Sequence, residues 1–225
     1  MTEDGINIRI YDKSGTASVD VYENGITGHK EISLPDLAGC FERSQEQESI
    51  HFYGLLPQGL VSYSGNSLEK YVVLRCPAQK ISYPYENQTY EHFPIPELIF
   101  GIHLNRDNMV LKTYLRVLPQ GPLSLDSPLY YYPFSNVYAN GQICMGRNEA
   151  LFYDKPQALE NYPAYVLSLQ NNDDLFTNMH NRKRLGHREL LDLLATKSTK
   201  YYYHHILVKR QQPERKNVYK HLNRL

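Results

Sequence analysis

Two side chains in the middle of the chain have the types and the spacing that acyl-transfer chemistry uses. Asn136 and Cys144 lie eight residues apart in FSNVYANGQICMG (residues 134–146), with an Asn140–Gly141 pair between them. Asn-Gly is a strong signal for a tight β-turn, because both residues tolerate positive φ. We therefore expect the turn to fold the segment back and to bring the Asn136 amide towards the Cys144 thiol.

A nucleophilic cysteine needs access, and it needs either a partly ionised thiol or a substrate that is already activated. In a protease-type reaction a histidine would activate the thiol, but the nine histidines are scattered and nothing local marks a Cys–His dyad. Acyl transfer through a thioester has other needs, since its acyl group arrives activated. Its transition state requires a donor for the developing oxyanion, and the side-chain amide of Asn136 is the candidate.

The same residues also have a purely structural interpretation. A cysteine after an Asn-Gly turn is often an inert, buried small hydrophobe. An asparagine in a Pro-rich loop commonly bonds its own backbone. The spacing alone leaves both interpretations open.

The other two cysteines are Cys40 and Cys76. An odd, widely spaced set without a C-x-x-C pair predicts neither a disulfide framework nor a metal site, and no cofactor is predicted. Cys40 shares one stripe of an expected helix with Leu37 and Phe41, so we predict that it is a core residue. Cys76 ends a strand-like run and is predicted to be buried in the same way as a small hydrophobe.

The first 49 residues are predicted to form a hairpin and a helix. Residues 16–34 contain two alternating runs joined through Asn24–Gly25, which is a hairpin signal. Ser33 is expected to cap the following helix, with Pro35 in its first turn and Asp36 three residues after the cap.

The rest of the chain places strands before helices. Strand-like runs are expected at 70–83, 93–105 and 109–118, with a tight hairpin at 105–108. Helices are expected at 155–162, where Asp154 is the cap, and from Pro163 to 170. A third helix is expected at 187–197, with Leu190, Leu191 and Leu194 on one stripe. This order predicts an α+β layer fold and not a parallel α/β sheet.

The composition is that of an ordinary globular protein, with 41% hydrophobic and 21% charged residues. No run approaches the roughly 18 apolar residues of a membrane-spanning helix. The N-terminus lacks the basic-then-apolar order of a signal peptide. We therefore expect a cytoplasmic protein with no membrane partner.

Charge is unevenly distributed along the chain. From residue 180 onward there are 12 lysines and arginines against three acidic residues, a net charge of +9, which leaves −9 for the first 179 residues. This asymmetry favours a basic C-terminal face that meets an acidic partner, or simply a solvated helical face.

The stretch YPFSNVYANGQICMG (residues 132–146) resembles the active-site segment of ubiquitin-conjugating enzymes. In that family a His-Pro-Asn tripeptide precedes a branched apolar residue, a turn with Asn- or Asp-Gly, and an Ile-Cys pair with the catalytic cysteine. Asn136 falls on the tripeptide's Asn and Ile143–Cys144 on the pair, whereas Phe134 and Ser135 replace the His and the Pro. The resemblance implies that Cys144 is the thiolate nucleophile and that Asn136 steadies the oxyanion.

Three stretches together are similar to the PRTRC system protein B group, a prokaryotic ubiquitin-conjugating-enzyme-like family. They are YGLLPQGL, FPIPELIFGI and SPLYYYPFSNVYANGQICMG. Members of this group are encoded beside a ThiF-type activating enzyme, a JAB-type metalloprotease and a small ubiquitin-like protein. The resemblance implies that these are the partners, and that Cys144 accepts the C-terminus of the ubiquitin-like protein and passes it to an amine.

The resemblance also implies a fold and a domain order. We expect a ubiquitin-conjugating-enzyme-like α+β fold with an antiparallel β-meander followed by helices and a β-rich N-terminal extension. The predicted parts are a hairpin and helix over 1–49, the catalytic domain over 50–200 and a basic tail over 201–225. The further residues considered for the site are Tyr132, Tyr138 and Asp126 as lining, and Arg147 as a contact for the incoming tail.

Two other functions are compatible with the sequence. One is a binding module of the same fold that does no chemistry, in which Cys144 would be no more reactive than Cys40 and Cys76. The other is a nucleic-acid-associated plasmid maintenance factor that uses the basic end KRQQPERKNVYKHLNRL. Nucleic acid is the less expected partner, because the whole chain is neutral and carries no DNA-reading motif.

Overall fold

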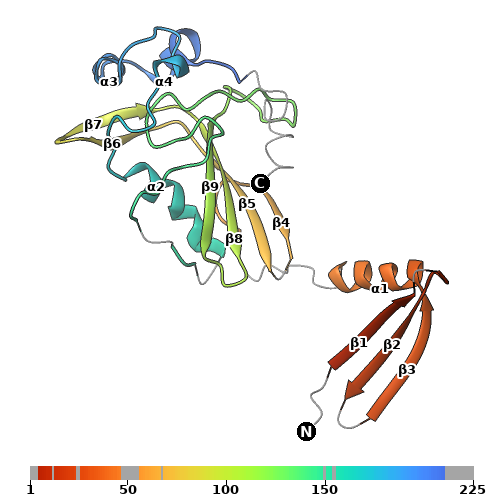
Figure 1. The fold of residues 1–225 in the computed structure, drawn as a ribbon. Helices are drawn as coiled ribbons and strands as arrows, with labels where there is room; N and C mark the ends of the chain where they lie inside the picture. The colour runs from red at the N-terminus through yellow and green to blue at the C-terminus, as the bar shows by residue number, and fades with distance from the viewer. Residues whose placement is uncertain are drawn as a thin grey trace. The chain divides into compact units, whose positions relative to one another are not determined.

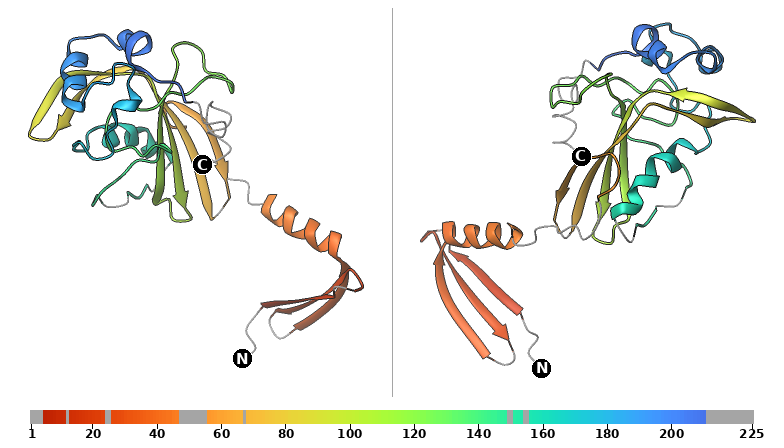
Figure 2. Two further views of the ribbon diagram at one scale, coloured as in Figure 1. Left: turned by 45° about the horizontal axis from the view of Figure 1, so that its top comes forward. Right: turned by 180° about the vertical axis from the view of Figure 1, so that it is seen from behind.

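The computed structural model describes residues 5–11, 13–23, 26–46, 56–66, 68–148, 151–153 and 156–210. The chain divides into two compact units, Met1–Ile50 and His51–Leu225. Figures 1 and 2 show each unit, with the first in red to orange and the second from yellow to blue. Within the described residues, no helix combines the length and the apolar character needed to cross a membrane.

The first unit is a three-stranded antiparallel sheet with one helix. Its elements are β1 (Gly5–Tyr11), β2 (Thr16–Glu23), β3 (Ile26–Ser33) and α1 (Leu34–Glu46), and the strands lie in the order β1-β2-β3. Glu23 pairs with Ile26, so the predicted hairpin is present, although its Asn24–Gly25 turn lies outside the described residues. The predicted helix cap is confirmed, because the Ser33 hydroxyl accepts a hydrogen bond from the Asp36 backbone N–H at 3.1 Å.

The prediction that Cys40 is a core residue is wrong. Cys40 is exposed, and Phe41 on the same helix is 52% exposed. Among the described side chains of this unit, only Ala17, Ser18 and Leu37 are buried. A three-stranded sheet is too narrow to cover the whole apolar stripe of α1, so the helix buries only the part of the stripe around Leu37.

The second unit is built on a four-stranded antiparallel sheet in the order β4-β5-β8-β9. The strands are β4 (Leu60–Gly65), β5 (Glu69–Cys76), β8 (Leu98–Asn105) and β9 (Val110–Val117). A separate two-stranded hairpin, β6 (Gln79–Tyr85) with β7 (Gln88–Ile95), interrupts the predicted meander between β5 and β8. The expected runs 70–83 and 93–105 each contain parts of two strands, and the breaks fall at Pro77 and at Pro96.

The helices follow the strands, as the sequence predicts, but most of them are short. They are η1 (Pro156–Asn161), α2 (Tyr162–Leu167), η2 (Asn178–His180), α3 (His187–Ala195), α4 (Thr199–Tyr201) and η3 (Tyr202–Ile206). Pro163 lies in the first turn of α2 as expected, and Leu190, Leu191 and Leu194 of α3 are fully buried. The predicted cap Asp154 lies outside the described residues. The unit is therefore a mixed α/β fold with antiparallel sheets and few helices.

The core of the second unit reaches beyond the sheet. The segment containing η1 and α2 lies along the four-stranded sheet, and α3 lies beside the β6–β7 hairpin (Figures 1 and 2). The Tyr202 hydroxyl donates to the Pro94 carbonyl at 2.6 Å, and Ile206 and Leu207 are fully buried. The packed part of the chain thus continues past residue 200, where the sequence predicted a separate tail, and residues 211–225 lie outside the described part.

Candidate active site

Cys144 lies in a short antiparallel hairpin with Asn136 opposite it. Val137 pairs with Ile143, and the Cys144 N–H donates to the Asn136 carbonyl at 2.8 Å. The predicted Asn140–Gly141 turn closes this hairpin, since the Asn140 side chain accepts from the Gln142 N–H at 2.9 Å. The turn therefore brings residue 136 to residue 144, as its sequence predicts.

The four-stranded sheet holds this hairpin in place. The Ile143 N–H donates to the Thr113 carbonyl and the Leu115 N–H to the Gly141 carbonyl, both at 2.8 Å. Val137 and Ile143 point into the core and are each 5% exposed. Successive residues of a strand point to opposite faces, so Asn136, Tyr138 and Cys144 share the face opposite to Val137 and Ile143.

That face opens on a pocket of about 450 Å³. Cys144 is partly exposed on it, and the polar residues that line it are Asn136, Tyr138, Asn148, Gln170, Asn172 and Asp174. A pocket of this size accommodates an extended chain end beside the thiol.

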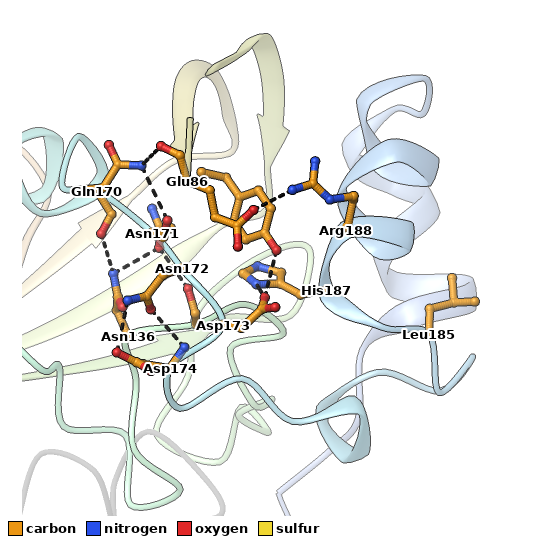
Figure 3. Close-up of polar contacts among 12 residues, drawn as sticks. Glu86, Asn136, Gln170, Asn171, Asn172, Asp173, Asp174, Leu185, His187 and Arg188 are labelled. Carbon is orange, nitrogen blue, oxygen red and sulfur yellow. Dashed lines mark hydrogen bonds and ion pairs between the residues drawn. The ribbon is translucent and has the colours of Figure 1, made fainter. Parts of the chain in front are cut away.

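Asn136 faces the loop that follows α2. Its backbone has a φ of 60°, a left-handed conformation that asparagine tolerates. Its amide nitrogen donates to the Gln170 carbonyl at 2.9 Å and to the Asn171 side-chain oxygen at 3.2 Å (Figure 3). Both hydrogens of this amide are therefore engaged.

The loop at 170–174 is fixed by its own polar contacts. Asn171 is 6% exposed, and its amide donates to the carbonyls of Leu169 at 2.9 Å and Pro84 at 3.2 Å. The next acidic residue, Asp173, accepts from the Tyr85 hydroxyl at 2.8 Å and lies 3.0 Å from Nδ1 of His187 (Figure 3). These bonds tie the loop to β6 and α3, and they leave Asp174 at the edge of the pocket.

The structure does not bring a histidine to the thiol. No described residue lining the Cys144 pocket is a histidine. His187 bonds Asp173 instead, and burial lowers the pKa of its imidazole. His180 stacks on Tyr131, and burial together with Arg210 and Arg116 lowers its pKa to about 4. A Cys–His dyad is thus absent from the described part of the chain around Cys144.

The hairpin that carries Cys144 lies within a segment that matches a known protein family. A model described as prokaryotic E2 family D matches residues 37–183, which is more than half of the chain and includes both Asn136 and Cys144. The chain belongs to prokaryotic E2 family D. Membership in this E2 family indicates an E2-like function, which is transferase activity in general terms. No curated protein and no solved structure matches the chain.

In this E2 family D protein, the two residues that stand where ubiquitin-conjugating enzymes have His and Pro, Phe134 and Ser135, are buried and pack against their neighbours. Phe134 is 1% exposed and packs edge-to-face against Phe93 and Tyr132, with ring centroids 5.6 and 5.2 Å away. Ser135 is fully buried, and its hydroxyl donates to the Asn171 side chain at 3.2 Å. An aromatic cluster and a buried serine thus anchor the hairpin that carries Cys144, at the positions where the tripeptide of ubiquitin-conjugating enzymes has His and Pro.

The remaining candidates are divided by their exposure. Tyr132 is 5% exposed and lines a small cavity of about 20 Å³ that Cys144 also lines. Cys76 is buried, as predicted. Asp126 and Arg147 are exposed, and neither lines the pocket. Tyr138, which the sequence offered as a lining residue, does line the pocket beside Cys144, and its interaction with the Cys144 side chain raises the pKa of its phenol.

Sequence reasoning missed the loop at 170–174 as part of the site. The polar run QNNDD after a helix was its one signal, because such a run cannot be buried without partners. Nothing in the sequence placed this run against a hairpin more than 30 residues earlier. Among the described residues, no three His, Cys, Asp or Glu side chains are grouped as ligands for a metal ion.

Proposed function

We propose that this protein is an E2-like carrier of the PRTRC system protein B type. In this proposal Cys144 holds the C-terminus of a small ubiquitin-like protein as a thioester and passes it to an amine. The observation that supports it most is the position of Cys144, partly exposed at a pocket of about 450 Å³ and paired with Asn136 across the hairpin.

The two proposed steps need no strong base beside the sulfur. In loading, the Cys144 thiolate attacks the carbonyl carbon that a ThiF-type activating enzyme has already activated, and the leaving group departs with its electron pair. In transfer, the amine nitrogen attacks the same carbon, the C–S bond breaks, and the electron pair returns to sulfur. Since the acyl group is activated throughout, the lack of a histidine in the pocket is compatible with this chemistry.

Asn136 is the proposed donor to the oxyanion of the transfer step. An amide N–H aimed at a developing oxyanion stabilises the transition state more than the ground state. In the uncharged protein both hydrogens of the amide are bonded to residues 170 and 171. The proposed role therefore requires one N–H to leave its present acceptor when the thioester is attacked.

The proposed partners follow from this carrier step. A ThiF-type enzyme supplies the activated acyl group, the small ubiquitin-like protein is the cargo, and a JAB-type metalloprotease encoded with them removes the cargo again. The acceptor is an amine that reaches the thioester through the pocket at Cys144.

The test is to mix the protein with the ThiF-type enzyme and the ubiquitin-like protein encoded beside it, with ATP, and to look for a heavier adduct on a non-reducing gel. We expect an adduct that a reducing thiol removes. Cys144→Ala should form none, and Cys144→Ser should form an oxyester that survives the thiol but not alkali.

Cys40→Ser is the matched control, because Cys40 is also exposed but lies in the other unit. It should form the adduct like the wild type. If the activating enzyme charges itself normally and the wild type forms no adduct, the carrier proposal is wrong and a non-catalytic binding module takes its place.

A further inference from the structure

We propose that Tyr138 is a catalytic residue, whose hydroxyl donates a hydrogen bond to the Cys144 thiolate when sulfur is the nucleophile and again when it is the leaving group. This inference rests on the proposed function, since it concerns the same thiol. It assigns to Tyr138 a role that Asn136 does not fill in the uncharged protein.

The register of the hairpin places the two side chains together. Val137 pairs with Ile143, so Tyr138 lies opposite Gln142, and its N–H donates to the Gln142 carbonyl at 2.9 Å. Tyr138 is therefore diagonal to Cys144 on the face away from the core. Diagonal neighbours across an antiparallel pair are within reach of an aromatic side chain.

Both side chains line the same pocket, where the phenol faces sulfur from the diagonal position. Interaction with the Cys144 side chain, through hydrogen bonding and then charge, together with slight burial, raises the pKa of Tyr138 above its ordinary value. The hydroxyl therefore keeps its proton at neutral pH and acts as a donor. With 44% of Tyr138 exposed, the ring can swing aside to admit an acyl group.

The described walls of the pocket offer no cationic side chain for this role. None of the residues lining it is a lysine, arginine or histidine, and its ionisable side chains are Tyr138, Cys144 and Asp174. Asp174 carries a negative charge that opposes a thiolate. The Asn136 amide gives both of its hydrogens to residues 170 and 171. Tyr138 is thus the ionisable hydrogen-bond donor that the described pocket offers to sulfur.

The electron pairs balance without a further reactant. During transfer the C–N bond forms and the C–S bond breaks, and its electron pair remains on sulfur. Tyr138 stabilises that anion through its O–H, which it keeps. The proton that the attacking amine loses passes to solvent water, which reaches the exposed pocket.

Tyr138→Phe tests the inference in the full chain without any partner protein. Iodoacetamide alkylation of Cys144 is followed by peptide mass spectrometry, which separates it from Cys40, across pH 6 to 10. Loss of a hydrogen-bond donor to the thiolate should move the midpoint of the pH profile to higher pH. The rate at pH 7 should fall only about threefold, because a more basic thiolate is also more nucleophilic.

Tyr90→Phe is the matched control, because its hydroxyl donates to Asp192 at 2.7 Å and makes the same kind of bond away from Cys144. It should leave the Cys144 profile unchanged. A wild-type profile in Tyr138→Phe overturns the inference, whether or not the protein forms an adduct with the ubiquitin-like protein. Failure of adduct formation with a shifted profile overturns the proposed function instead.

Discussion

At the scale of single residues, Asn136 has a structural task before any chemistry begins. Its φ of 60° turns the chain, and its amide ties the hairpin to the 170–174 loop. An amide carries only two N–H donors, so any bond to an oxyanion must replace one of these. Structural and catalytic contributions of Asn136 therefore need a variant that separates them.

Asn136→Gly separates the backbone turn from the side chain, because glycine accepts the positive φ without strain but lacks the amide. We expect it to form the Cys144 adduct and to transfer the cargo to a free amine at least about tenfold more slowly than the wild type. Single-turnover discharge of the preformed adduct measures this rate. Discharge at the wild-type rate would mean that Asn136 only shapes the loop.

At the scale of the element, the site depends on the hairpin turn and on what lies beneath it. Gly141 has a φ of +91°, and a Cβ built on it would lie 1.0 Å from a guanidinium nitrogen of Arg116. Arg116 is 1% exposed and donates to the Leu115 carbonyl at 2.6 Å, so displacing its guanidinium disturbs a buried contact. The Asn-Gly turn thus satisfies a packing requirement as well as a backbone one.

Gly141→Ala should lower the free energy of unfolding by more than about 2 kcal/mol, from the left-handed backbone and the contact with Arg116 together. Gly146→Ala is the control, since Gly146 has a φ of +57° but no atom within 4 Å of the added Cβ. It should cost only about 1 kcal/mol. Denaturant unfolding of both variants gives the difference, and equal losses would show that Arg116 does not constrain the turn.

The elements that could be predicted from the sequence are those that local contacts stabilise, between residues close together in the chain. The 105–108 hairpin was predicted, and the Asn105 side chain accepts from the N–H groups of Asp107 at 3.0 Å and Met109 at 2.8 Å. The leucine stripe of α3 is likewise visible in the sequence. The exposure of Cys40 and the approach of residues 170–174 to Cys144 were not predictable, because they depend on how much surface distant segments cover.

At the scale of the whole molecule, titratable groups in the core of the second unit link its stability to pH. His180 and His187 both have lowered pKa values because burial opposes their charged forms. His180, with a pKa of about 4, is neutral in the folded state near pH 6, whereas an exposed histidine of the unfolded chain is partly protonated there. The unfolded state thus binds more protons, and stability falls as the pH falls.

His180 gives the clearest pH window, since its folded pKa is about 4. The free energy of unfolding keeps its full value from this residue above about pH 6.5. It then falls progressively as the pH falls towards 4, because the unfolded chain binds a proton that the folded His180 does not. His180→Phe keeps the ring stacked on Tyr131 and removes the titration. The free energy of unfolding of this variant should depend less on pH between 6.5 and 4.5, whereas an unchanged slope would assign the acid sensitivity to other groups.

The central claim is that Cys144 carries the ubiquitin-like protein as a thioester, and intact mass spectrometry under acidic, non-reducing conditions tests it most directly. After incubation with the activating enzyme, the cargo and ATP, the mass should rise by that of the cargo less one water. It should return to the starting value on treatment with a reducing thiol, and Cys144→Ala should show no rise. The same rise in Cys144→Ala would contradict the claim, because the cargo would then be attached elsewhere.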